Sequence, residues 1–219
     1  MLKPENLFSE QEKKRIAEAV KAAELRTSGE IVPYIVGRSD TYSEAWLRAG
    51  LLLAFFVLFL FALADMGTDL WLPFGYAESG VLVILAFGLG AALTVFVPFV
   101  KRLFVPNGIL QQRVDERAAL AFVSEEVFNT RDRTGILIFI SLFERRVRIL
   151  GDAGINKLVK QEEWDAIVQL IVDAVRNNAA AEGMLEAIWK CGELLERQGV
   201  EIRPDDTNEL DNRVRFSDS

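Results

Sequence analysis

The chain has 219 residues, 51% of them apolar, and a formal net charge of −7. The negative charge argues against nucleic acid as a partner, because nucleic-acid binding draws on an excess of Lys and Arg to neutralise phosphates. The chain has no histidine and a single cysteine, Cys191. These counts exclude histidine-containing catalytic triads and zinc sites, and an internal disulfide.

The first predicted elements are a helix and a strand. Ser9 and Glu12 have the spacing of a capping box, and apolar residues follow at helical spacing up to about Gly29. Residues 30–37 then predict a strand. Pro33 cannot donate a hydrogen bond to a neighbouring strand, so we expect this strand at a sheet edge or with a bulge.

Two long uncharged runs follow. Residues 49–64 and residues 79–100 lack charged side chains, and runs of about this length can cross a bilayer as helices. The sequence therefore predicts a transmembrane helical hairpin, and the absence of ionisable groups inside it indicates an anchor rather than an ion pathway. Gly88 and Ala92 form a small-xxx-small pair, which predicts where the two helices pack closely.

The charges around the hairpin predict its orientation. Basic residues lie before the first run and after the second, whereas the connecting loop is acidic and has neither Lys nor Arg. By the positive-inside rule, both termini should be cytoplasmic in a multi-pass protein of the cell inner membrane. The residues concerned are Arg38, Arg48, Lys101 and Arg102 outside the loop, and Asp65, Asp69 and Glu78 within it.

The part after the hairpin predicts a helix over about residues 111–129 and then two strands, which end by residue 152. A tight turn at Arg145 and Arg146 should join the two strands. Two amphipathic helices follow, with Trp164 on the apolar face of the first and Met184 on that of the second.

Neither flanking part has enough strands and helices to form a sandwich alone. Because a helical hairpin returns the chain to the side that it left, we expect the two parts to fold together as one domain. The polar end of the chain predicts an extended or disordered tail. The predicted boundaries are 1–45 for the first part of the α/β domain, 46–102 for the transmembrane hairpin, 103–200 for the second part and 201–219 for the acidic tail.

The order of these pieces resembles the TPM-domain family. The stretch "TGILIFISLFERRVRILGDAGI" is the most diagnostic, with "TSGEIV" before it and "NELDNRV" near the end. The likeness is to the bacterial membrane branch, which carries a two-span insertion. It implies an α/β fold, a three-layer α/β/α sandwich with a small mixed sheet, interrupted by the transmembrane hairpin. It also implies a choice of functions, since members are described as phosphatases, as metal-binding proteins with acidic loops, or as assembly and maintenance factors.

The candidate site is the loop that follows the strand pair. Gly151 and Gly154 would let the backbone approach an ion, and Asp152 offers a hard oxygen ligand for Ca²⁺ or Mg²⁺. The alternative is an Asp-Gly turn, followed by acidic residues that favour the start of the next helix. Both interpretations stay open at this stage. The acidic residues that would complete a metal shell are Glu162, Glu163 and Asp165.

A group of arginines surrounds the strand pair in the sequence. They could form a solvated surface, contact anionic lipid or a protein partner, or stabilise a phosphoryl group. Gly151 and Gly154 could take part in the same anion or partner contact. The arginines are Arg131, Arg133, Arg145, Arg146 and Arg148, of which the last three are the candidates for that contact.

These patterns favour a membrane-anchored, cytoplasm-facing module that binds or assembles a partner at the bilayer. A metal-dependent phosphatase, with Ca²⁺ or Mg²⁺, is the alternative. The expected partners are the lipid bilayer and another membrane protein, or a second copy of the chain in a homo-oligomer. A transporter or channel is disfavoured, because two apolar helices line no polar path.

Overall fold

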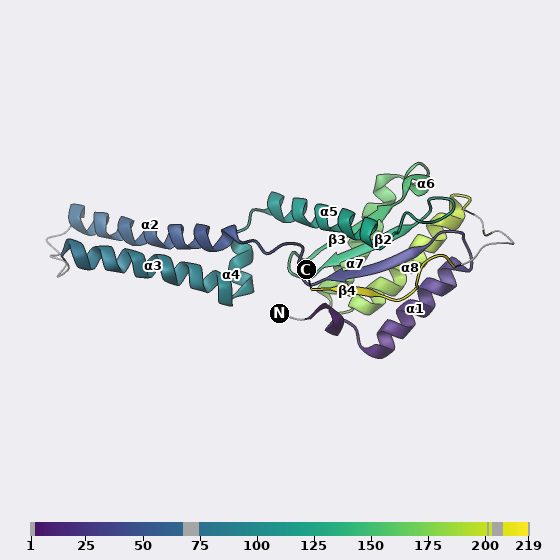
Figure 1. Ribbon diagram of the computed structural model, residues 1–219, viewed down its shortest axis with the longest axis horizontal. Helices are drawn as coiled ribbons and strands as arrows, with labels where there is room; N and C mark the ends of the chain where they lie inside the picture. Colours follow the sequence, from purple (N-terminus) through teal and green to yellow (C-terminus); the bar gives the residue numbers. More distant parts are fainter. Residues whose placement is uncertain (1–2, 68–74, 201, 203–207, 219) are drawn as a thin grey trace. The chain divides into compact units, whose positions relative to one another are not determined.

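A computed structural model describes residues 3–67, 75–200, 202 and 208–218, and the chain divides into two compact units (Figure 1). The first unit comprises Met1–Asp40 and Gln111–Ser219, and the second comprises Thr41–Leu110. Asp69, which supports the predicted orientation, lies outside the described residues. So do residues 201 and 203–207 of the predicted tail.

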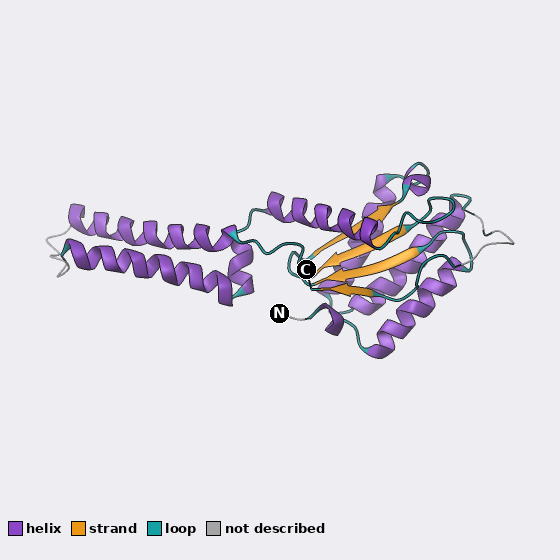
Figure 2. Cartoon of the chain, in the orientation of Figure 1, coloured by secondary structure: helices purple, strands orange, loops and turns teal. Residues whose placement is uncertain are grey.

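Four strands of the first unit form one mixed sheet, in the order β3-β2-β1-β4 (Figure 2). β1 runs parallel to β2 and to β4, whereas β2 and β3 are antiparallel neighbours. All residues of β1 and β2 are buried, and most are β-branched or aromatic residues that favour a pleated sheet. The strands are β1 (Ile31–Val36), β2 (Ile136–Ser141), β3 (Arg146–Gly151) and β4 (Arg215–Ser217).

The predicted edge position of Pro33 is wrong, because β1 lies between β2 and β4. The proline is tolerated because β4 pairs only with the last three residues of β1, while Pro33 itself is paired with Ile138 of β2.

The strand β4 comes from the end of the predicted tail. Part of that tail is therefore neither disordered nor merely extended, since Arg215–Ser217 complete the sheet.

Helices cover both faces of the sheet and form the three-layer α/β/α sandwich that the resemblance implies. On one face, α1, α7 and α8 pack around buried residues such as Ile16, Ile138 and Ile171. On the other face, α5 brings Val114 against Phe139 of the sheet. The helices of this unit are η1 (Pro4–Asn6), α1 (Glu10–Glu24), α5 (Asn107–Ser124, from Gln111 onward), α6 (Ala153–Asn156), α7 (Gln161–Arg176) and α8 (Ala180–Arg197).

Local signals set several helix limits. The hydroxyl of Ser9 accepts the backbone N–H of Glu12, and the Glu12 carboxylate accepts the backbone N–H of Ser9 at 2.7 Å, which confirms the predicted capping box. The helix predicted over residues 111–129 ends earlier, at Ser124. Soon after it, Glu126 adopts a positive φ of 53°, a conformation that cannot continue a right-handed helix.

The second unit contains two long antiparallel helices and a short one. The long helices include stretches of 21 and 20 residues that are apolar and long enough to cross a bilayer. Only 17% of the most apolar window of each is buried, so they differ from the core helices of a soluble protein. Phe55 and Leu85, for example, are 65% and 61% exposed. The helices are α2 (Glu44–Gly67), α3 (Tyr76–Phe96) and α4 (Pro98–Leu103).

Two glycines bring α2 and α3 together. A Cβ atom on Gly90 would lie 2.6 Å from the carbonyl oxygen of Ala49, and one on Gly50 would lie 2.7 Å from the ring of Phe87. The prediction that Gly88 forms this contact is wrong, because a Cβ atom there would meet nothing within 4 Å. An apolar helix carries no polar residues to show which side faces its neighbour, so the sequence pattern does not distinguish the side of Gly88 from that of Gly90.

Candidate functional site

Three strand ends meet at the end of the sheet where β1 and β2 begin and β3 finishes. Ile136 is in register with Ile31 on one side and with Gly151 on the other. The backbone N–H of Asp152 donates to the carbonyl of Gly135 at 2.9 Å, which holds the candidate loop against the start of β2. This strand-end region, called the acidic end below, contains Asp152.

Asp152 is engaged by groups of its own chain. Its side chain is 5% exposed. One carboxylate oxygen accepts the Nε of Arg133 at 2.6 Å, and the other accepts a second guanidinium nitrogen at 3.0 Å and the backbone N–H of Ala153 at 2.6 Å. A bidentate arginine and a helix N-cap thus use both oxygens. Asp152 orders this loop whether or not it has a further role.

The two glycines of the loop allow close packing. A Cβ atom on Gly154 would lie 2.5 Å from the carbonyl oxygen of Asp132, and the N–H of Gly154 donates to the carbonyl of Arg133 at 3.0 Å. A Cβ atom on Gly151 would lie 3.1 Å from the side-chain oxygen of Asn156. Both glycines therefore have neighbours from the same chain where an ion was expected to approach.

The other predicted metal ligands have separate partners on α7. Glu163 accepts the backbone N–H of Lys160 at 3.2 Å and forms an ion pair with Arg197. Asp165 accepts the side-chain amide of Gln161 at 2.9 Å, and Glu162 is exposed in the first turn. Among the described residues, no three His, Cys, Asp or Glu side chains form a group that could hold a metal ion. The metal role of these four carboxylates stays a prediction.

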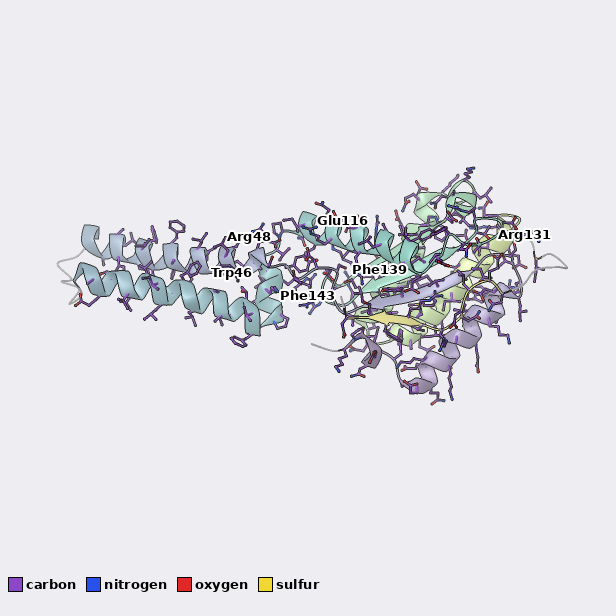
Figure 3. All side chains as sticks on the ribbon, in the orientation of Figure 1. Trp46, Arg48, Glu116, Arg131, Phe139 and Phe143 are labelled. Carbon is purple, nitrogen blue, oxygen red and sulfur yellow. The ribbon has the colours of Figure 1, made fainter. Side chains whose placement is uncertain are left out.

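The arginines do not form one cluster. Arg146 and Arg148 alternate along β3 and bond to Gln111 and Asp115 of α5, whereas Arg145 is exposed in the β2–β3 turn. The other two predicted arginines lie at the acidic end, where Figure 3 labels Arg131. The strand pair therefore separates positive charges that are close in sequence.

A pair of carboxylates at the acidic end, Glu30 buried and Glu24 half-buried, was not identified from the sequence. Glu24 ends α1 and Glu30 precedes β1, and both residues line the same small cavity. Burial, reinforced by the adjacent carboxyl of Glu30, raises the pKa of Glu24 to about 8. Burial also raises the pKa of Glu30. The pair can thus hold a proton at neutral pH.

This carboxylate pair holds the segment that leads to β4. Glu30 accepts the backbone N–H groups of Glu209 at 3.0 Å and Leu210 at 3.3 Å. Glu24 accepts the side-chain amide of Asn212 and the backbone N–H of Ile31. Because Glu209, Leu210 and Asn212 come from the far end of the sequence, only the folded chain reveals what this pair binds.

A small cavity lies beside this carboxylate pair. Its volume is about 120 Å³, and its walls include Lys21 and Asn208 as well as Glu24 and Glu30. Pockets that enclose small organic ligands usually begin at about 300 Å³. The cavity therefore suits water or a small ion better than a substrate.

The family assignment rests on the segment that contains α5, β2, β3 and the candidate loop. Residues 94–194 match the family model described as the TPM domain. The chain contains a TPM domain. The matched part of the TPM domain includes Asp152 and the acidic residues of α7, whereas Glu24, Glu30 and β4 lie outside it.

A solved structure supports the same fold. The NMR structure of the BA42 protein from the psychrophilic bacterium Bizionia argentinensis matches this TPM-domain chain with a TM-score of 0.60 and 21% sequence identity. The match covers 99% of this chain and 100% of that chain. At this level of identity the likeness shows the fold alone. No curated protein matches the chain.

Proposed function

We propose that this TPM-domain protein is anchored in a membrane and that its α/β unit binds or assembles a partner at the bilayer surface. The observation that carries the proposal is the exposure of large apolar side chains along two helices of membrane-crossing length. A bilayer is the environment that fits such surfaces, because water does not favour extended apolar patches. The chain leaves the α/β unit after Asp40 and returns to it at Gln111, so the anchor is an insertion.

The flanking charges support a cytoplasmic position for the α/β unit. Arg38, Arg48, Lys101 and Arg102 lie next to the two spans on the side of the termini, and the connecting loop has no basic residue. Basic residues are retained on the cytoplasmic side during insertion. A reporter enzyme fused after Ser219 should therefore be active only in the cytoplasm. One fused near Gly75 should be active only outside, and the reverse pattern would contradict the orientation.

The polar groups of the α/β unit favour binding over phosphatase chemistry. A metal-dependent phosphatase needs several ligands around one ion and cations that can meet the phosphoryl group. Here Asp152 is bonded to Arg133, and the carboxylates of Glu24 and Glu30 hold the segment before β4. These bonds lie within the chain itself, so the described geometry does not favour the phosphatase alternative.

Capture after crosslinking in native membranes tests the binding role. The full chain should retain a specific membrane-protein partner or a second copy of itself. The matched control carries the same α/β unit on an unrelated two-span hairpin of equal length. Capture of the same partner by both forms assigns binding to the α/β unit, whereas no specific capture by either form would contradict the proposal.

The phosphatase alternative has its own test. The purified chain is incubated with a chromogenic phosphomonoester in the presence of Ca²⁺, Mg²⁺ or a chelator. We expect no turnover above the background in any condition. Metal-dependent turnover that disappears in Asp152→Asn would favour the enzyme instead.

A further inference from the structure

The chain turns sharply where α3 ends. Val97 has an extended backbone, with φ −118° and ψ 96°, and Pro98 begins α4. A proline cannot supply the N–H that would continue the α3 hydrogen-bond pattern. Figure 1 shows α4 turned away from the line of α3 at the base of the hairpin.

The short helix α4 has one exposed apolar face. Phe99 and Leu103 are 62% and 67% exposed and lie one helical turn apart. Phe96, at the end of α3, is 81% exposed. Arg102, between Phe99 and Leu103 in the sequence, places a positive charge at the edge of this apolar face, whereas Lys101 lies on the other side of the helix. The combination of large apolar and basic side chains is typical of helices that lie in the membrane interface.

Polar contacts hold this segment at the start of α2. The ammonium group of Lys101 donates to the carbonyl of Thr41. Arg48 donates to the carbonyl of Phe104 at 3.3 Å, and Figure 3 shows Arg48 beside Trp46 near the base of the same helix. The segment after α3 is therefore fixed to the base of the hairpin and presents its apolar face outward.

We propose that α4 lies in the headgroup layer of the bilayer, with Phe99 and Leu103 inserted at the boundary between headgroups and acyl chains. Arg102 would face anionic phospholipid headgroups, while Lys101 fixes the segment to Thr41. The proposal rests on the membrane anchorage proposed above, because it assigns a depth to a segment continuous with the second span. Its partner is the lipid surface itself, which the continuity with α3 brings to this face.

Spin labels on single cysteines test the depth of α4. Cys191 is fully buried and can be replaced by alanine, which leaves a chain without other cysteines. The labelled variants are Phe99→Cys, Leu103→Cys, Phe55→Cys in the middle of α2 and Leu120→Cys on the outer side of α5. Each is reconstituted in vesicles of phosphatidylcholine and phosphatidylglycerol. The collision rates with oxygen and with a water-soluble nickel chelate are then measured.

We expect the oxygen-to-nickel ratio at positions 99 and 103 to lie between those of positions 55 and 120, and to exceed that of position 120 several-fold. A ratio at 99 and 103 equal to that at 120 would overturn the inference while the anchorage stands. Low access to both reagents would also overturn it, because protein rather than lipid would then cover the face. If position 55 is as accessible to nickel as position 120, the anchorage itself fails.

Discussion

The two compact units use apolar residues in opposite ways. In the α/β unit, large side chains such as Ile138 and Phe139 are completely buried, and the buried carboxylates have partners in the same chain. In the helical unit, glycine and alanine lie between the helices, while phenylalanine and leucine point outward. An exposed leucine therefore has a different meaning in each unit. On α5 it is an ordinary surface residue. On α3 it belongs to a continuous apolar surface of the kind that contacts lipid in the proposed anchor.

The largest expected effect is the separation of the two units. Deletion of residues 44–102, with a short flexible linker in their place, should give a water-soluble chain with one cooperative unfolding transition. The reason is that β1, before the hairpin, finds its neighbours β2 and β4 after it. Calorimetry of the purified variant checks this, and two separate transitions would contradict the single-domain prediction.

Two matched leucines sharpen the contrast. Leu85 on α3 and Leu120 on α5 are 61% and 60% exposed. Leu85→Arg should disfavour membrane insertion by about 3 kcal/mol, whereas Leu120→Arg should change the free energy of unfolding by no more than about 0.5 kcal/mol. The fraction of protein that resists alkaline extraction from membranes measures the first effect. Equal behaviour of the two variants would mean that α3 does not face lipid.

The carboxylate pair of Glu24 and Glu30 predicts a pH dependence inside the α/β unit. The folded chain keeps the Glu24 proton up to about pH 8, while the unfolded chain loses it near the ordinary pKa of 4.5. The free energy of unfolding should therefore fall as the pH rises between these values. Glutamine at position 24 cannot lose a proton. In Glu24→Gln the decrease in the free energy of unfolding over this pH range should therefore be smaller by about 1–3 kcal/mol. Thermal unfolding between pH 5 and pH 8 is the measurement, with the exposed Glu18→Gln on the same helix as the control.

A smaller effect than that of Glu24→Gln is expected at the candidate loop. Asp152→Asn keeps the helix cap but removes the charge that Arg133 contacts, and Arg133 is 54% exposed. The free energy of unfolding should therefore fall by about 1 kcal/mol or less. We expect no shift of the melting temperature with Ca²⁺, Mg²⁺ or chelator. A metal-dependent shift in the wild type that Asp152→Asn abolishes would instead make Asp152 a metal ligand.

Features with local causes could be predicted from the sequence. The capping box at Ser9 depends on a residue three positions away, and the burial of Trp164 and Met184 follows from helical periodicity. The length of an apolar run was likewise sufficient to indicate the two long helices. These signals lie within one element and do not need the rest of the fold.

Features that depend on distant parts of the chain were missed. β4 has only three residues, and it pairs with β1, which lies near the other end of the sequence. The partners of Glu30 lie about 180 residues further along the chain. For the candidate site, the sequence identified Asp152 but not Arg133 as its partner, because only the fold brings the two strand ends together.

The parallel pairing of β1 with β2 has a consequence for the order in which the chain is made. β1 leaves the ribosome first, and its partners follow only after the hairpin has been synthesised. Once the hairpin has formed, Thr41 and Lys101 are in contact, which more than halves the free loop between β1 and β2. Each halving of a flexible loop lowers the entropic cost of closing it by about 0.6 kcal/mol. Insertion of the two helices would thus make the pairing of β1 with β2 less costly in entropy, and β4 would pair last.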